Sequence, residues 1–184
     1  MQRKSFGTMQ CPIARSLERV GEWWSILILR DALHGLTRFD EFRESLGIAP
    51  NMLSRRLNAL VEAGLLERRR YSTRPPRDEY LLTERGRDFR PVVLALLAWG
   101  NRHFAPEGAS VVLVNRRTGA PVDPILADPA TGRPVEEPDY GLAPGPAASE
   151  RILKKFGTAD RVPTARDGPS AARSPRGTPG SRVA

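Results

Sequence analysis

The stretch LTRFDEFRESLGIAPNMLSRRLNALVEAGLLERRRYSTRPPRDEYLLT, residues 36–83, contains the pattern that decides the fold. A short helix is expected at Phe39–Leu46, where apolar residues recur at helical spacing. Gly47 suits the C-terminal end of that helix, and a tight turn follows. A second helix is expected over Pro50–Ala63, because proline is tolerated at the first helical position and the leucines fall on one side.

A β-hairpin is expected directly after the helix pair. Its strands are Leu65–Tyr71 and Asp78–Leu82, and the loop Ser72–Arg77 carries two prolines that restrict its tip. Helix, turn, helix and hairpin in this order are typical of a winged helix-turn-helix, which places its second helix in the DNA major groove. Taken singly, each part is equally compatible with a solvated helix face or an ordinary charged hairpin, so the combination favours DNA binding.

Polar side chains on the free face of the Pro50–Ala63 helix are candidates for base contacts. They lie opposite the leucines at about 100° per residue, and their amide, hydroxyl and guanidinium groups can bond to base edges. Arginines at the start of the first helix and in the hairpin are candidates for phosphate or minor-groove contacts. The predicted DNA-contact set is Asn51, Ser54, Arg55 and Asn58 for bases, Arg56 near the DNA backbone or the protein core, and Arg38, Arg74 and Arg77 for phosphate or the minor groove.

The net charge of +8 is weak support for DNA binding because of its distribution. Residues 151–184 carry 8 of the Lys+Arg and 2 of the Asp+Glu, so most of the excess lies in a C-terminal segment. Residues 36–77 carry nine arginines and five acidic residues, and five of those arginines cluster around the hairpin. Local placement, rather than total charge, therefore indicates a nucleic-acid partner.

Two further helices are expected before this stretch. The first begins at Cys11-Pro12 and ends at Gly21. The second, Trp23–Leu33, is apolar around most of its surface, which is typical of the buried centre of a small domain.

A long apolar stripe is expected in the helix that starts at Thr83-Glu84. Thr83 is a good N-cap, and Pro91 predicts a kink or a true start near Arg90. The first helices already cover one face of the domain, so we expect this stripe to pair with a second copy, and in part with the first helix. The predicted dimerisation residues are Phe89, Val93, Leu96, Leu97, Trp99 and Phe104.

The sequence changes character after Pro106. The unit Thr-Gly-x-Pro-Val-acid occurs at Thr118–Asp123 and again at Thr131–Glu136, which indicates successive hairpin turns. Strands are expected near Val111–Asn115, Pro124–Ala127 and Val135, and a last helix at Ala148–Phe156. A structural role is favoured over covering the dimer helix or a ligand pocket. The predicted fold is mainly α with a small β part, divided into a winged helix-turn-helix and dimerisation domain (1–107), a small β-rich appendage (108–156) and a disordered basic tail (157–184).

No enzyme chemistry is indicated by the sequence. Two histidines and one cysteine have no metal-ligand spacing, and we find no phosphate loop or nucleophile motif, so no metal, cofactor or catalysis is expected. The chain has neither a signal peptide nor an apolar run that could span a membrane, and a cytoplasmic location is expected. Cys11 is either a reactive thiol favoured by the helix dipole and Arg15, or a small buried residue at a helix start.

Several motifs resemble the HxlR family of bacterial winged-helix transcription regulators, over roughly residues 11–104. They are Cys11-Pro12, Gly21-Glu22-Trp23-Trp24, Arg38-Phe39, Arg56-Leu57, Gly64-Leu65-Leu66 and the string from Pro75 to Thr83, with Gly86, Pro91 and Trp99. Two positions depart from the family pattern. Ala49 replaces a frequent serine before the helix, which removes an N-cap hydrogen bond, and Glu22-Trp23 stands where relatives often have Gly-Lys before tryptophan.

The resemblance implies a homodimer that binds double-stranded operator DNA in the nucleoid and represses, or sometimes activates, nearby genes. Some relatives use the cysteine that Cys11 matches to sense oxidants or electrophiles, so an effector of that kind is a candidate partner. The predicted function is a sequence-specific homodimeric repressor that reads an inverted repeat with helix 50–63 and wing 72–77. The alternative is a dimeric winged-helix protein-interaction module or redox adaptor without specific DNA binding.

Overall fold

The structure, a computed structural model, describes residues 11–136 and 138–157 of the chain. These residues divide into two units with a boundary after Val135, and each unit is described by itself. The predicted disordered tail, residues 157–184, lies outside the described residues apart from Gly157. Within the described ranges, no helix is long and apolar enough to cross a membrane.

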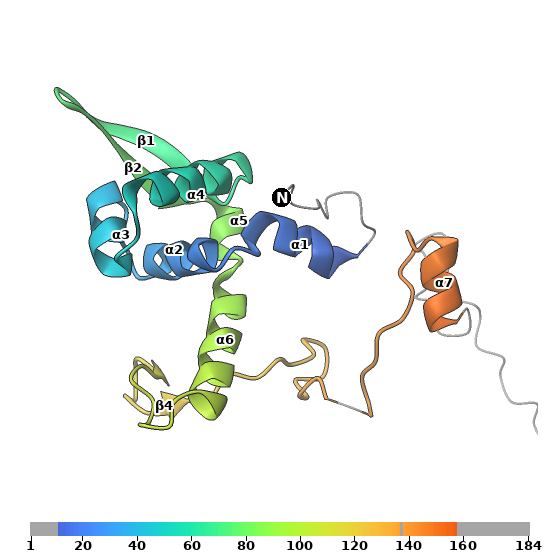
Figure 1. Cartoon of the computed structure of the whole chain (residues 1–184). Helices are drawn as coiled ribbons and strands as arrows, with labels where there is room; N and C mark the ends of the chain where they lie inside the picture. Colours follow the sequence, from blue (N-terminus) through green and yellow to red (C-terminus); the bar gives the residue numbers. More distant parts are fainter. Residues whose placement is uncertain (1–10, 137, 158–184) are drawn as a thin grey trace, which may run out of the picture. The chain divides into compact units, whose positions relative to one another are not determined.

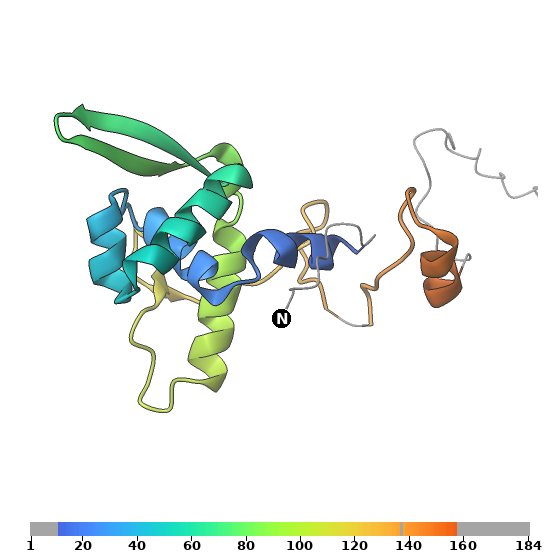
Figure 2. The same ribbon diagram turned by 45° about the horizontal axis from the view of Figure 1, so that its top comes forward.

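Four helices build the core of the first unit: α1 (Pro12–Val20), α2 (Trp23–Leu33), α3 (Phe39–Leu46) and α4 (Pro50–Glu62). Figures 1 and 2 show α2, α3 and α4 gathered beneath the hairpin that follows them. The innermost side chains come from α2, α3, α4 and the start of the hairpin: Ile28, Leu29, Phe42, Leu53, Leu57, Leu60 and Leu66. The helix pair and its leucine-lined inner face are therefore confirmed, as is the burial of the α2 centre.

One residue of α2 departs from the expected burial. Trp23 is 75% exposed, although the helix was predicted to be buried around most of its surface. The buried positions of α2 include Ile28, Leu29 and Ala32, and Trp23 lies on the opposite side at about 100° per residue. The composition of α2 is apolar all round, but only one side faces the core.

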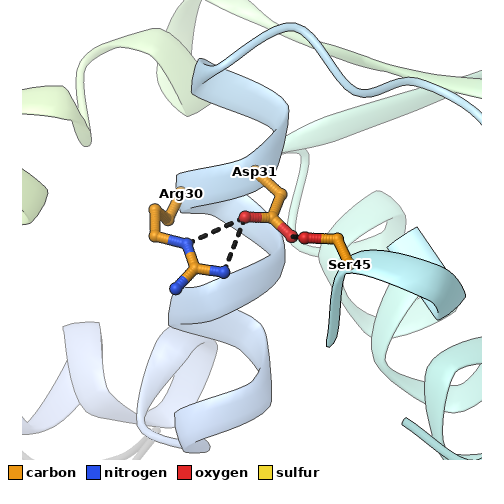
Figure 3. Close-up of polar contacts among 3 residues, drawn as sticks. All are labelled: Arg30, Asp31 and Ser45. Carbon is orange, nitrogen blue, oxygen red and sulfur yellow. Dashed lines mark hydrogen bonds and ion pairs between the residues drawn. The ribbon is translucent and has the colours of Figure 1, made fainter. Parts of the chain in front are cut away.

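Buried Asp31 connects α2 to α3 (Figure 3). Asp31 is 3% exposed and lies in the core-facing row of α2. Arg30 Nε donates to Asp31 Oδ1 over 2.8 Å, and Ser45 Oγ on α3 donates to Asp31 Oδ2 over 2.7 Å. A buried carboxylate is costly unless its oxygens are bonded, and here both are, so the pair of helices is held in one arrangement.

Glu41 caps the N-terminus of α3. Its Oε2 accepts hydrogen bonds from the backbone N–H groups of Thr37 and Arg38, over 2.9 and 2.8 Å. These bonds favour the charged carboxylate and hold the pKa of Glu41 below its usual value. By contrast, Ala49 at the start of α4 makes no side-chain cap bond, as the sequence predicted.

The hairpin consists of β1 (Leu66–Thr73) and β2 (Pro76–Leu82), which pair antiparallel with a bulge between Arg70 and Ser72. It is longer than predicted, and only Arg74 and Pro75 remain outside the strands. The predicted loop was too long because Pro76 can begin an exposed strand without needing its missing N–H. In Figures 1 and 2 the hairpin projects beyond α3 and α4.

The base of the hairpin is fixed to the helix-turn-helix. Tyr80 N–H donates to the Thr37 carbonyl over 2.7 Å, and Arg38 forms an isolated antiparallel bridge with Glu79. The segment before α3 thus acts as a third short strand of the wing.

Two helices follow the wing, α5 (Glu84–Arg87) and α6 (Arg90–His103). The Thr83 hydroxyl caps α5 by accepting from Gly86 N–H over 3.1 Å. The predicted start near Arg90 is confirmed, because Pro91 occupies the first turn of α6. Figures 1 and 2 show α6 extending away from α2, α3 and α4.

A second small hairpin follows α6, with strands β3 (Leu113–Val114) and β4 (Pro121–Val122). The strand predicted at Pro124–Ala127 is present only as an isolated antiparallel bridge between Ala127 and Pro134, next to a hydrogen bond from Val135 N–H to the Leu126 carbonyl. The β-strand itself lies earlier, because the first Thr-Gly turn brings Pro121 opposite Val114. Asn101 and Arg102 of α6 hold the segment by bonds to the Val111 carbonyl and to Asp123, each over 2.9 Å.

The two repeat units form the same turn, as predicted. Gly119 N–H donates to the Asn115 carbonyl, and Gly132 N–H donates to the Asp128 carbonyl, over 2.8 and 2.7 Å. Both glycines have positive φ, which other residues rarely adopt. After the boundary at Val135, the described residues contain the helix α7 (Glu150–Phe156), close to the predicted range.

Candidate nucleic-acid interface

The free face of α4 is open to solvent. Asn51, Ser54, Arg55 and Asn58 are all exposed, while Leu53, Leu57 and Leu60 on the other side are buried. Within the described residues, Arg55 donates only to Met52 Sδ, over 3.5 Å, and a thioether is a weak acceptor, so its guanidinium can move toward another acceptor. The structure therefore brings the four predicted base-contact residues together on one exposed face.

Arg56 points away from that face. Its Nη2 lies 3.1 Å from Glu22 Oε2, the side chain is 19% exposed, and its buried Nε has no hydrogen-bond partner among the described residues. Arg56 thus joins α4 to the N-cap residue of α2. The sequence allowed Arg56 to lie near the DNA backbone or near the protein core. In the structure it lies near the core.

The arginines of the wing fall into two groups. Arg69 and Arg70 are paired across the strands with Glu79 and Asp78. The hydrogen bond from Arg70 holds the pKa of Asp78 below its usual value, which favours a closed ion pair. Arg74 and Arg77 are exposed and form no ion pair within the described residues, which leaves them available to an external anion.

Arg38 belongs to the same surface as the wing. Its guanidinium carbon lies 4.9 Å from the centre of the Tyr71 ring, in a cation–π contact. Sequence reasoning placed Arg38 at the start of α3 but missed Tyr71. Tyr71 could not be predicted because its position depends on the register of the hairpin. That register follows only once the turn is known to be centred on Arg74 and Pro75.

The predicted dimerisation residues lie on two sides of α6. Phe89 and Leu96 line an apolar groove of about 640 Å³ between α1 and α5–α6, with Ile13, Leu17 and Val92. Leu97 instead lines a hollow beside β3 and β4. Val93 is half-buried, and Trp99 and Phe104 are exposed and stack edge to face, 4.8 Å apart. The prediction missed Val92, which is 46% exposed.

Cys11 is the N-cap residue of α1 and is half-buried. The next two residues, Pro12 and Ile13, line the apolar groove. A change in the size or charge of Cys11 would therefore occur beside the groove. No group of three or more metal-ligating side chains occurs in the part of the chain that the structure describes.

Residues 19–108 match the HxlR-like helix-turn-helix family. HTH-type transcriptional regulator Rv3095 of Mycobacterium tuberculosis is 39% identical over 141 residues, which cover 76% of this chain and 89% of the relative. The chain belongs to the HxlR-like family. This HxlR-like protein is accordingly a transcriptional regulator of the helix-turn-helix class and not an enzyme, as the sequence predicted.

Two solved structures are similar to this HxlR-like chain. A structure described as a transcription factor of Pseudomonas aeruginosa, PA1374, is 62% identical with a TM-score of 0.59, and the match covers 79% of this chain and all of that one. The crystal structure of the transcription factor PA1607 is 39% identical with a TM-score of 0.68, and the match covers 76% of this chain and 99% of that one. Both matches cover more of the chain than the part that ends with α6.

Proposed function

We propose that this HxlR-like regulator is a homodimeric, sequence-specific repressor that acts on nucleoid DNA in the cytoplasm. The observation that carries the proposal is the open face of α4, where Asn51, Ser54 and Arg55 stand beside a wing whose Arg74 and Arg77 have no carboxylate partner in the described residues. Amide and guanidinium groups read base edges in the major groove, and unpaired arginines bind phosphate or enter the minor groove. The exposure of this face also favours DNA over the alternative of a protein-interaction module.

The apolar groove between α1 and α6 supports the dimer. Ile13, Leu17, Val92 and Leu96 expose between 41% and 68% of their surface, an unusual cluster for a monomer. A second copy with the same groove would bury these side chains in a two-fold interface. Two copies of α4 would then lie about 34–36 Å apart and read an inverted repeat.

Selection of bound sequences from a random duplex pool tests the proposal. We expect enrichment of an inverted repeat, with half-sites about one helical turn apart. A reporter placed behind the selected sequence should be less active when the protein is present. Equal affinity for the selected duplex and a random duplex would rule out sequence-specific regulation, and increased reporter activity would rule out repression.

Oxidation of Cys11 is a second proposal, favoured by its place next to the groove. A larger or charged sulfur group at the start of α1 would disturb the adjacent apolar surface. We expect oxidant to change operator affinity in the native protein and to have no effect in the Cys11→Ser variant. Unchanged binding of the native protein after verified oxidation of Cys11 would contradict this proposal.

A further inference from the structure

Three consecutive arginines on β1 have different partners. Arg69 Nε lies 2.8 Å from Glu79 Oε1, and Arg70 Nε lies 2.5 Å from Asp78 Oδ1, so a cross-strand carboxylate balances each of these charges. Arg68 forms no such ion pair within the described residues. Its hydrogen-bond and ring partners, Asn58 and Tyr80, are neutral. The nearby Asp78 carboxylate attracts Arg68 but is hydrogen-bonded to Arg70, so Arg68 is the arginine of the three that is not held in an ion pair in the described part of the chain.

Arg68 is held between the wing and α4. It pairs with Tyr80 in the hairpin register, and its guanidinium carbon lies 5.6 Å from the centre of the Tyr80 ring. Its Nη2 donates a hydrogen bond to Asn58 Oδ1 on the free face of α4. The aromatic ring and the amide fix the position of the guanidinium without cancelling its charge.

The same bond changes what Asn58 can do. An asparagine amide has one carbonyl oxygen and one NH2 group, and bidentate recognition of adenine needs both. Asn58 Oδ1 already accepts from Arg68, which uses one of its two lone pairs and ties the amide to the wing arginine, so the amide cannot turn toward a base without breaking this bond. This geometry suits Asn58 to hold Arg68 rather than to read a base.

We propose that Arg68 contacts a DNA phosphate and that Asn58 is its positioning residue, an inference that rests on the proposed DNA-binding function. The DNA strand that separates the groove entered by α4 from the groove reached by the wing passes between these two elements. Arg68 lies at that junction outside any ion pair of the described residues, and its side chain is already held by Asn58 and Tyr80, so it loses little rotamer freedom on binding.

Operator binding at a series of salt concentrations tests Arg68. In Arg68→Gln, the slope of log affinity against log salt should fall by about 1.8, because the operator binds two copies of the chain and each lost phosphate contact lowers the slope by about 0.9. Arg68→Lys should keep the slope, because it keeps the charge. The matched control is the double variant Arg70→Gln/Asp78→Asn, which removes a balanced pair from the same face and should leave the slope unchanged. Thermal unfolding of each variant verifies folding.

A double-mutant cycle tests Asn58. Asn58→Ala should weaken binding to all duplexes equally and leave the selected base preferences unchanged, and it should have no further effect in the Arg68→Gln background. An unchanged salt slope in Arg68→Gln, or a changed base preference at one operator position in Asn58→Ala, would overturn the inference alone. Failure of the native protein to prefer any selected duplex would overturn the proposed function and this inference together.

Discussion

Arg55 and Arg56 are adjacent in the sequence and have opposite surroundings. Arg55 lies on the exposed face of α4, whereas Arg56 is largely buried and paired with Glu22 at 3.1 Å. Because successive residues of a helix are rotated by about 100°, one residue can serve recognition while its neighbour serves stability. The two arginines therefore provide matched controls for each other.

Alanine substitutions at these two positions should separate DNA binding from folding. Arg55→Ala should lower specific operator affinity by about 1–3 kcal/mol and leave the unfolding temperature unchanged. Arg56→Ala should lower the free energy of unfolding by about 1–3 kcal/mol, because it removes a packed side chain and leaves Glu22 without this cation. Operator titration and thermal unfolding of both variants measure the two effects. Equal loss of stability in both would contradict this assignment.

Gly86 lies against backbone and cannot accept a side chain without movement. A Cβ atom there would lie 2.1 Å from the Leu65 carbonyl oxygen and 2.9 Å from Leu82 Cδ2. Gly86→Ala should therefore lower the free energy of unfolding by about 1–3 kcal/mol. Gly100→Ala is the control, because a Cβ atom added to this residue of α6 would have no neighbour within 4 Å among the described residues. Chemical denaturation should show Gly100→Ala unchanged or more stable, and similar losses for both would refute the steric explanation.

Periodicity predicts some residue positions well and others poorly. It placed Arg55 on the free face of α4 and the leucines inside, because both follow from one rotation per residue. It could not identify Glu22 as the partner of Arg56, because the two residues are brought together only by the packing of α4 on the start of α2. Likewise, the exposure of Trp23 depends on which side of α2 the other helices cover.

At the scale of elements, the cap of α3 makes stability depend on pH. The pKa of Glu41 is lowered from 4.5, chiefly by the hydrogen bonds from Thr37 and Arg38. A lowered folded-state pKa means that the cap stabilises the protein fully above pH 4.5 and that this contribution is lost as the pH falls through the lowered value. Glu41→Gln removes the charge and so should remove most of this dependence.

Denaturation of wild type and Glu41→Gln across a pH series measures the effect. The difference in free energy of unfolding between them should be constant near neutral pH and should shrink below pH 4.5. Glu44 is also exposed on α3 and, among the described residues, makes no cap hydrogen bond. Glu44→Gln is therefore the control. A difference that stays constant into acid would contradict the proposed role of the charged cap.

Element boundaries were predictable where a local signal fixes them. Gly47, Thr83 and Pro91 each mark a helix end or start, and the structure agrees at all three. The hairpins were less predictable, because strand pairing depends on where the turn closes. The bulge at Tyr71 and the strand at Pro121–Val122 depend on turn geometry, and the positions of apolar residues do not predict that geometry.

At the scale of the whole molecule, the α1–α6 groove is the surface that we propose for dimerisation. Leu96→Glu places a charge in a groove whose lining is mainly apolar, and it should convert the proposed dimer to a monomer. Operator affinity should fall as well, because each half-site would be bound independently. Sedimentation equilibrium and operator titration check both consequences.

Ile125→Glu is the matched control for that substitution. Ile125 is 66% exposed and lies outside the groove lining, so the change adds the same charge without affecting the proposed interface. A dimeric Leu96→Glu protein would exclude this groove as the main interface. A monomeric Ile125→Glu protein would instead indicate that the segment after β4 contributes to assembly.

The sequence predicted that the α6 stripe would be available to a partner, but not how it would be divided. Phe89 and Leu96 face the groove with α1, while Leu97 faces the second hairpin. The sequence pattern shows one apolar stripe along the helix. Only the positions of α1 and of the β3–β4 hairpin show that the residues of this stripe belong to two different surfaces.

The two Thr-Gly turns are repeated units of the chain beyond α6. Each turn closes with its own hydrogen bonds, from Asn115 to Ala120 and from Asp128 to Arg133, and neither uses a residue of the other. A self-contained turn of this kind can be copied in tandem without disturbing what precedes it. Deletion of residues 115–127 would join Val114 directly to the second turn and restore a complete turn at the same place. The chain beyond α6 therefore contains repeated whole turns, and we expect the variant that lacks residues 115–127 to keep the helices and the wing folded.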